Sequence, residues 1–143
     1  MEKRYRTSAH ARYTIYYHLV FCPKYRRKIF KDFDIDDHIK TAIRTMANYH
    51  DWLIEELETD QDHLHVHLSA PPRYSPAMIV RLLKNWTYKH VYRTHPELKS
   101  HLWGGKMWAE GYYVSTVSDR ATREEINRYI RNQKRQYNQL KLL

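Results

Sequence analysis

Three histidines occupy alternate positions in the stretch "DHLHVHLS", residues 62–69. Successive side chains of a β-strand point to opposite faces of a sheet, so His63, His65 and His67 are expected on one face and aliphatic residues on the other. Imidazoles two positions apart are separated by roughly 7 Å along a strand, which lets two of them converge on one metal ion. The outer two are roughly 13 Å apart. The spacing therefore predicts a metal-binding pair and a bystander.

The histidine strand is expected to be one of four strands that position it. Strands of this kind alternate in polarity or are rich in β-branched and aromatic residues. The segments with these properties are "YTIYYHLVFC" (13–22), "LIEELET" (53–59), "HLHVHLSA" (63–70) and "YYVSTVS" (112–118). A short turn, "DQD" (60–62), joins the second strand to the third, which indicates an antiparallel pair.

Apolar residues at helical spacing predict helices over residues 35–52 and 75–93, and a last helix within the C-terminal segment 118–143. Ser75 is expected to cap the second helix and Pro76 to begin it. Thr122 and Glu125 form a capping-box pattern at the start of the last one. The resulting order β-α-β-β-α-β, plus a C-terminal helix, predicts an α+β fold: a ferredoxin-like antiparallel sheet with its helices on one face. The histidines are then expected on the uncovered face, within reach of a ligand.

The composition favours a nucleic-acid partner. The 143 residues contain 25 Lys or Arg against 16 Asp or Glu, a net charge of +9, and 14% of the residues are aromatic. An excess of cations suggests a polyanion, and exposed bases stack on aromatic rings. On charge alone, DNA-backbone contacts are assigned to Arg26, Arg27, Lys28, Arg128, Arg131 and Lys134.

The remaining composition indicates one cytoplasmic domain over residues 1–143. A single cysteine, Cys22, excludes an internal disulfide and a zinc site made of thiolates. No apolar run approaches the roughly 20 residues that cross a bilayer, and the N-terminus has no signal-peptide core. We therefore expect no contact with a membrane.

Two families contain a histidine string of this kind. Read as three His-aliphatic pairs, residues 63–68 resemble the histidine-triad nucleotide hydrolases, in which a histidine attacks a phosphate. Read as Asp-His-aliphatic-His ahead of small residues, residues 62–69 resemble the HUH endonucleases, in which two histidines hold a metal and a tyrosine attacks DNA. The histidine-triad motif normally closes its domain, whereas a strand and two helices are expected after His67. The chain also lacks the glycine-rich flanks of such a nucleotide pocket.

The HUH interpretation requires a nucleophilic tyrosine and a further metal ligand elsewhere in the chain. The last helix contains both in "YIRNQ", where Tyr129 and Gln133 lie four residues apart and share one helix face. The phenol can attack phosphorus, and the amide oxygen can complete the coordination of the metal. A free phenol has a pKa of about 10, so it needs a polarised phosphate to react at neutral pH.

Over nearly its whole length, the sequence resembles the single-tyrosine HUH transposases of the insertion-sequence 200/605 family. The resemblance is carried by "YHLVFCPKYRRKIF" (17–30), "DHLHVHLSAPP" (62–72), "LWGGKMWAEGYYVSTVS" (102–118) and "YIRNQ" (129–133). It implies that His63 and His65 bind Mg²⁺ or Mn²⁺, that Gln133 is the third ligand and that Tyr129 is the nucleophile. His67 stands where the family usually has an aliphatic residue.

The resemblance also implies an activity, a substrate and an assembly. The activity is cutting and rejoining of single-stranded DNA through a 5′-phosphotyrosine, at ends marked by hairpins. Because excision takes two cuts and each chain supplies one nucleophile, a homodimer is expected, and the tyrosine helix can serve the partner's histidine pair. Two alternatives stay open: a nucleotide hydrolase of the histidine-triad type, and a relative that binds hairpin DNA without cutting it.

Overall fold

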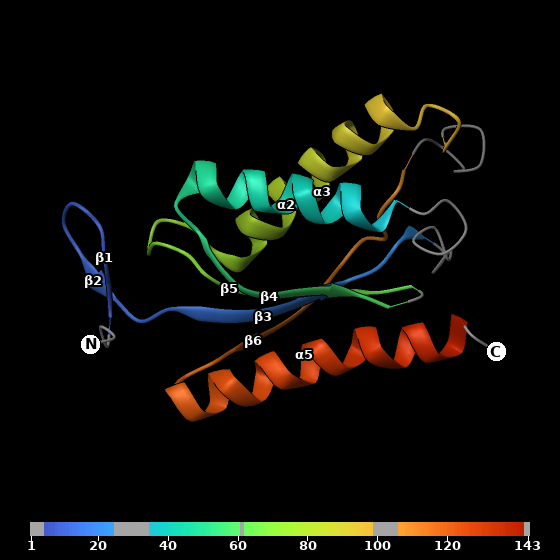
Figure 1. Ribbon diagram of the computed structural model, residues 1–143. Coiled ribbons are helices and arrows are strands. Elements are labelled where there is room, and N and C mark those ends of the chain that lie inside the picture. Colours follow the sequence, from blue (N-terminus) through green and yellow to red (C-terminus); the bar gives the residue numbers. More distant parts are fainter. Residues whose placement is uncertain (1–4, 25–34, 61, 99–105, 142–143) are drawn as a thin grey trace.

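A four-stranded antiparallel sheet forms the centre of the computed structural model. The structure describes residues 5–24, 35–60, 62–98 and 106–141, without the side chains of residues 134–141. The strand order is β4-β5-β3-β6 (Figure 1). The strands are β3 (Tyr16–Phe21), β4 (Leu53–Thr59), β5 (Leu64–Ser69) and β6 (Tyr113–Thr116). Every neighbouring pair runs antiparallel. The predicted ferredoxin-like sheet is confirmed.

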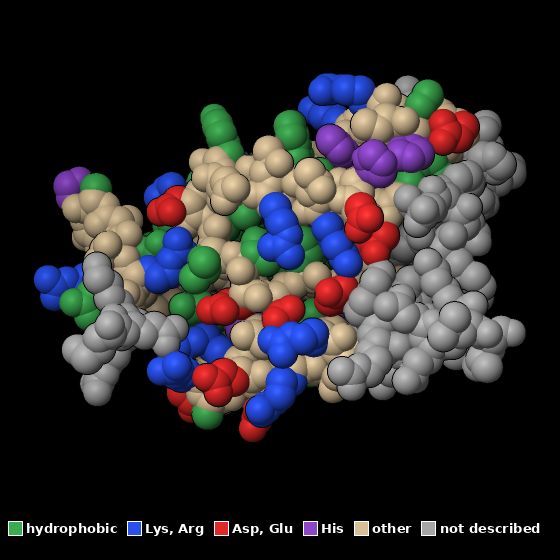
Figure 2. Space-filling model, viewed as in Figure 1, with side chains coloured by type: hydrophobic (Ala, Val, Ile, Leu, Met, Phe, Trp, Pro, Cys, Tyr) green, Lys and Arg blue, Asp and Glu red, His purple; other side chains and the backbone are tan. Residues whose placement is uncertain are grey.

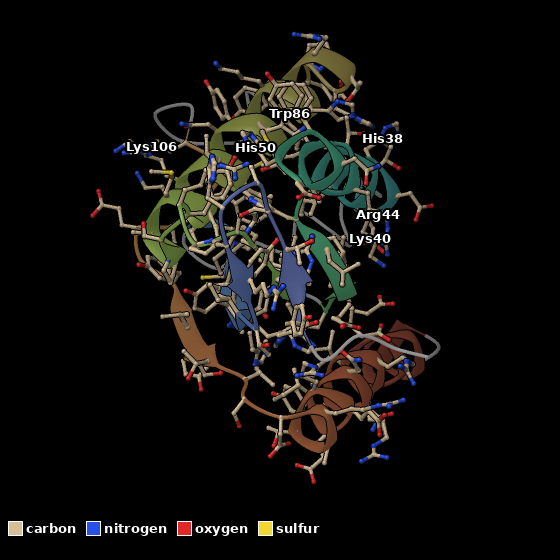
Figure 3. The ribbon with its side chains drawn as sticks, turned by 90° about the vertical axis from the view of Figure 1, so that its left-hand side faces the viewer. His38, Lys40, Arg44, His50, Trp86 and Lys106 are labelled. Atoms are coloured by element: carbon tan, nitrogen blue, oxygen red, sulfur yellow. The ribbon has the colours of Figure 1, made fainter. Side chains whose placement is uncertain are left out.

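Helices cover both faces of this sheet. Helices α2 (Asp36–His50) and α3 (Pro76–Thr94) lie on one face, and α5 (Arg120–Lys141) lies across the other, against β4 and β5 (Figure 1). In Figure 3, seen from the hairpin end, the sheet again lies between α5 and the other two helices. The labelled Lys40 and Arg44 mark α2 in that view. The prediction that the histidine face is uncovered is therefore wrong. The apolar stripe of the last helix needs a surface to bury it, and this face supplies one, as the complete burial of Ile130 shows.

The hydrophobic core lies between the sheet and the first two helices. Leu64, Val66 and Leu68 of β5 point to this side and are completely buried. They pack with apolar residues of the helices, among them Ile39, Ile43, Ile79 and Leu83. The alternation of strand side chains thus places the aliphatic half of the histidine string where the sequence predicted it.

A short N-terminal hairpin, β1 (Arg6–Thr7) and β2 (Arg12–Tyr13), precedes the sheet and was not predicted. Arg6 anchors it: its guanidinium donates to the carbonyl oxygens of Ser69, at 2.9 Å, and Asp51, at 3.0 Å. The expected strand over 13–22 is thereby divided, because Tyr13 pairs within the hairpin and the sheet strand begins at Tyr16.

The helix starts agree with the sequence in one case and differ in another. Ser75 caps α3 as predicted, since its hydroxyl accepts a hydrogen bond from the backbone N–H of Met78 at 3.1 Å. The prediction that Thr122 caps the last helix is wrong, because α5 begins at Arg120. The Asp119 carboxylate acts as the cap and accepts a hydrogen bond from the backbone N–H of Thr122 at 2.8 Å. Among the described residues, no helix combines the length and the apolarity that crossing a membrane demands.

Candidate active site

The sheet register assembles two rows of side chains beneath α5. Residues directly opposite each other on neighbouring strands point to the same face. One row consists of Glu58, His65, Val20 and Tyr113, and the next of Glu56, His67, His18 and Ser115. His18 of β3 therefore lies beside the histidines of β5, although sequence reasoning did not select it. The centroid of the His18 ring lies 5.8 Å from that of the His65 ring, and the two rings are stacked.

A cavity of about 610 Å³ lies between this face and α5. The four residues predicted to bind metal or attack phosphate, His63, His65, Tyr129 and Gln133, all line it. Besides the aliphatic Val20 and Ile126, the cavity is lined by three residues with polar side chains that sequence reasoning missed: His18, Asp60 and Tyr113. The signal that could have found Asp60 is the acidic "DQD" segment, which we interpreted as a turn alone.

Tyr129 reaches the histidines of its own chain. Its ring centroid lies 5.9 Å from that of His18 and 6.0 Å from that of His65, and 48% of the residue's surface is exposed. Next to it in the helix, Ile130 is completely buried, which fixes the orientation of α5 on the sheet. A half-exposed phenol beside buried imidazoles is accessible to a substrate while its position is held by the helix.

Two polar contacts also hold α5 on the sheet. The guanidinium of Arg131 donates to the Glu56 carboxylate at 2.5 Å. Asn127 Oδ1 lies 2.6 Å from Nδ1 of His67, which is completely buried. An amide oxygen accepts a hydrogen bond, so the His67 ring carries its proton on Nδ1. His67 thus contacts the tyrosine helix rather than solvent, which corrects the expectation of an exposed histidine row.

Carboxylates orient His65 of β5 and His63, which immediately precedes that strand. Asp62 contacts Nδ1 of His63 at 2.7 Å, and Asp60 contacts Nε2 of His65 at 3.3 Å. Asp60 also accepts the backbone N–H groups of Asp62, at 3.0 Å, and His63, at 2.7 Å. Burial would raise the pKa of Asp60, but the hydrogen bonds from His65 and from these backbone groups outweigh it and lower the pKa. Asp60 therefore closes the turn and fixes the histidine pair at once.

The donor atoms in this corner of the cavity fit a divalent cation. Ligand atoms of Asp60, Asp62 and His63 lie within 4.8 Å of one another. Nδ1 of His65 is buried without a hydrogen-bond partner, which is consistent with a nitrogen that coordinates a metal when one is bound. Carboxylate and amide oxygens suit Mg²⁺ or Mn²⁺, and imidazole nitrogens complete such sites. Of the predicted ligands His63, His65 and Gln133, this cluster contains His63 alone, and its other two members are carboxylates that were not predicted.

The buried histidines of the second row are neutral at neutral pH. Burial, together with the neighbouring His65 and His67, lowers the pKa of His18 to about 4. Burial also lowers the pKa of His67, although the hydrogen bond to Asn127 acts in the opposite direction. His18 and His67 therefore contribute no imidazolium charge to this face at neutral pH.

The residues assigned to the DNA backbone are only partly described. Arg26, Arg27 and Lys28 lie outside the described residues, as does the side chain of Lys134. Arg128 is exposed on α5, whereas Arg131 is engaged by Glu56. Among the assigned cations whose side chains the structure describes, Arg128 is thus the one without a carboxylate partner.

The fold is shared with transposases of known structure. The crystal structure of a Deinococcus radiodurans protein described as a transposase matches with a TM-score of 0.70 at 32% identity, over 90% of this chain and 97% of that chain. A REP-associated tyrosine transposase bound to a REP hairpin matches with a TM-score of 0.59 at 12% identity, over 87% of this chain and 70% of that chain. The fold therefore defines the class of protein, that of the transposases.

Sequence comparison narrows the class. The ISDra2 transposase TnpA of Deinococcus radiodurans is 34% identical over 121 residues, 85% of each chain. The transposase for insertion sequence element IS200 of Salmonella typhimurium is 32% identical over 125 residues, 87% of this chain and 80% of the relative. The model of the IS200-like transposases matches residues 11–133, and the chain belongs to this family. It is a DNA-cleaving enzyme of transposition.

Proposed function

We propose that this transposase cuts and rejoins single-stranded DNA through a covalent bond between Tyr129 and the 5′-phosphate of the cut strand. The observation that supports the proposal is the shared cavity: the Tyr129 ring lies 6.0 Å from that of His65 in a space that His63 and Gln133 also line. A tyrosine, two histidines and a side-chain amide thus line one cavity, as the proposed chemistry requires. The proposal treats residues 1–143 as one HUH transposase domain.

The cleavage step exchanges one phosphate ester for another. The Tyr129 hydroxyl oxygen bonds to phosphorus, and the bond from phosphorus to the 3′-oxygen of the preceding nucleotide breaks. The phenol loses a proton and the departing oxygen gains one, which leaves a 5′-phosphotyrosine and a free 3′-hydroxyl. Because the number of ester bonds is unchanged, a 3′-hydroxyl from another cut end can reverse the step and join a new strand.

We propose that His63, His65 and Gln133 hold Mg²⁺ or Mn²⁺, with Asp60 and Asp62 as neighbouring oxygen donors. When bound, the cation supplies neutralisation of the negative charge that develops on the phosphate. Asp60 holds the ring of His65 through its 3.3 Å contact, and Asp62 holds that of His63. His65 is only 5% exposed, so its ring is held within the protein beside the cavity.

The proposed substrate is DNA with hairpins at the ends of the element, and the proposed assembly is a homodimer. Two cuts need two tyrosines, and a two-fold dimer provides them. Strand β6 supports this assembly, because within the described residues it pairs with β3 alone, and Tyr113 and Val114 on the strand and Tyr112 just before it are exposed. An open edge and exposed aromatic side chains are suited to a second chain.

A denaturing gel tests the proposal directly. The protein is mixed with Mn²⁺ and a panel of hairpin oligonucleotides labelled at either end. We expect a protein–DNA adduct that carries the 3′ label, and release of the 5′-labelled fragment with a free 3′-hydroxyl. Tyr129→Phe removes the attacking oxygen and should abolish the adduct, while Tyr49→Phe, a highly exposed tyrosine of α2, should leave it unchanged.

Two results would contradict the proposal in different ways. An adduct that persists in Tyr129→Phe would show that another group attacks. Hairpin binding without any adduct in the wild-type protein would favour the relative that binds DNA without cutting it. Mass spectrometry of the digested adduct identifies the modified residue in either case.

A further inference from the structure

Four arginines lie over tyrosine rings near the Ser69 end of β5 and the adjoining hairpin. The guanidinium carbon is 5.4 Å from the ring centroid for Arg6 over Tyr13, 5.5 Å for Arg12 over Tyr5, 4.8 Å for Arg73 over Tyr74 and 4.4 Å for Arg123 over Tyr16. We call these eight residues the arginine–tyrosine band. Guanidinium groups that stack on rings keep their N–H donors pointing outward in the plane of the group.

The pairs of the band are neighbours in space. Arg6 pairs with Tyr13 across the hairpin, and its guanidinium donates to the carbonyl oxygen of Ser69. Tyr16 opposes Ser69 in the sheet. Burial raises the pKa of Tyr13, whereas the nearby charges of Arg6 and Arg73 act to lower it, which places both cations close to this one phenol. The band is therefore one surface rather than four scattered contacts.

The band is connected to the active-site face. The ring of Tyr16 lies 5.8 Å from that of His67, and Arg123 belongs to the first turn of the helix that carries Tyr129. In Figure 2, Lys and Arg side chains occur along the left end of the molecule, from the β1–β2 hairpin toward the start of α5. The band therefore borders the sheet face that carries the cavity, at the Ser69 end of β5.

Two members of the band are available to a ligand. Arg6 is engaged by Asp51, whose carboxylate lies 3.5 Å away, and Arg123 is half-buried and donates to the carbonyl oxygen of Ser118. Arg12 and Arg73 are exposed, and within the described residues neither guanidinium takes part in an ion pair or a hydrogen bond. Their charges are thus presented to solvent with the side chains already ordered on tyrosine rings.

We propose that the arginine–tyrosine band is a second DNA-binding surface, which holds backbone phosphates outside the active-site cavity through Arg12 and Arg73. Flat guanidinium forks match phosphate oxygens in pairs, and ordering on a ring reduces the entropy lost on binding. The inference extends the proposed function, because it names where DNA that leaves the cavity is held. It concerns affinity and leaves the attack by Tyr129 untouched.

The test compares two double variants of equal charge change. Arg12→Gln with Arg73→Gln removes the free cations of the band. Arg44→Gln with Arg81→Gln removes exposed cations from α2 and α3, across the sheet from α5 (Figure 3). Binding is measured by fluorescence anisotropy at several NaCl concentrations with three labelled probes: a hairpin with single-stranded flanks, a hairpin stem without flanks, and oligo-dT.

We expect the band variant to bind the flanked hairpin at least about 10-fold more weakly, the loss of two charge-assisted contacts. Its slope of log affinity against log salt should fall by about 1.8 if the contacts are to duplex phosphates, or about 1.4 if they are to a single strand. The stem and oligo-dT probes identify which of the two is held. The control variant should stay within about 2-fold of wild type.

The outcomes that overturn the proposal are distinct from failure of the chemistry. Equal losses in the two double variants would mean that net charge alone matters, and wild-type affinity in the band variant would mean that the band does not touch DNA. Arg12→Lys with Arg73→Lys keeps the charge but loses the flat fork, and should weaken binding roughly 3-fold. At saturating DNA, the band variant should still form the adduct. If the wild-type protein forms no adduct, only the proposed function is overturned, because the band is tested by affinity.

Discussion

The two faces of the same sheet have opposite characters. Toward α2 and α3, strand β5 presents Leu64, Val66 and Leu68, which fill a continuous apolar core. Toward α5, the same strand presents His65 and His67, which are just as buried. One face therefore gains free energy from the removal of apolar surface from water. The other buries polar groups, which lowers stability unless they are hydrogen-bonded.

The α5 face leaves several of its polar atoms unpaired. Nε2 of His18, Nδ1 of His65, Nε2 of His67 and Oγ of Ser69 are buried with no hydrogen-bond partner among the described residues. On the core face, the side chains of the four strands offer no such atom, although Nε1 of Trp52, which packs in the core, also lacks a partner among the described residues. The difference indicates that one face is built for stability, and that the other sacrifices some stability to keep ligand atoms free for a substrate or an ion.

The largest expected effect lies on the core face. Leu68→Ala removes a completely buried side chain and leaves a cavity, so the free energy of unfolding should fall by about 2–5 kcal/mol. Urea unfolding followed by circular dichroism measures it. A loss below about 1 kcal/mol would show that this face is not the main source of stability.

Asp60→Asn tests the α5 face by metal affinity instead of stability. The amide can still accept the backbone N–H groups that close the turn, but the charge beside His65 is lost. Loss of a carboxylate that orients a metal-binding histidine should weaken Mn²⁺ binding about 10- to 100-fold. Isothermal titration with Mn²⁺ measures the change without DNA, and Asp37→Asn, an exposed acid of α2, is the matched control. Unchanged affinity would remove Asp60 from the site.

The smallest effect is expected next to Leu68 in the chain but on the opposite face. His67→Leu removes the contact to Asn127 and also a nitrogen that has no partner, so the unfolding free energy should change by less than about 1.5 kcal/mol. Adduct formation should persist, whereas His63→Ala should abolish it. A loss as large as that of Leu68→Ala would mean that the two faces contribute alike to stability. Loss of the adduct in His67→Leu but not in His63→Ala would reverse the predicted metal pair.

Local patterns predicted most of the elements well. Strand β4 lies where "LIEELET" predicted it, and α3 begins at Pro76 after a Ser75 cap, because both signals come from residues a few positions apart. The errors occurred where distant contacts decide. The hairpin at residues 6–13 is anchored by Arg6 on Ser69 and Asp51, far away in sequence. Helix α5 begins at Arg120, before the predicted Thr122, because the Asp119 side chain caps it.

For the candidate site, the sequence by itself determined which side chains share a face of their own element. The period of two put His63, His65 and His67 on one face, and the helical spacing put Tyr129 and Gln133 on another. Tertiary structure alone decided that these two faces meet around one cavity, that His18 and Asp60 join them and that His67 is buried beneath Asn127. The reason is physical: periodicity fixes the direction of a side chain relative to its own element, whereas the partner across a sheet or beneath a helix depends on how separate elements bury their surfaces against one another.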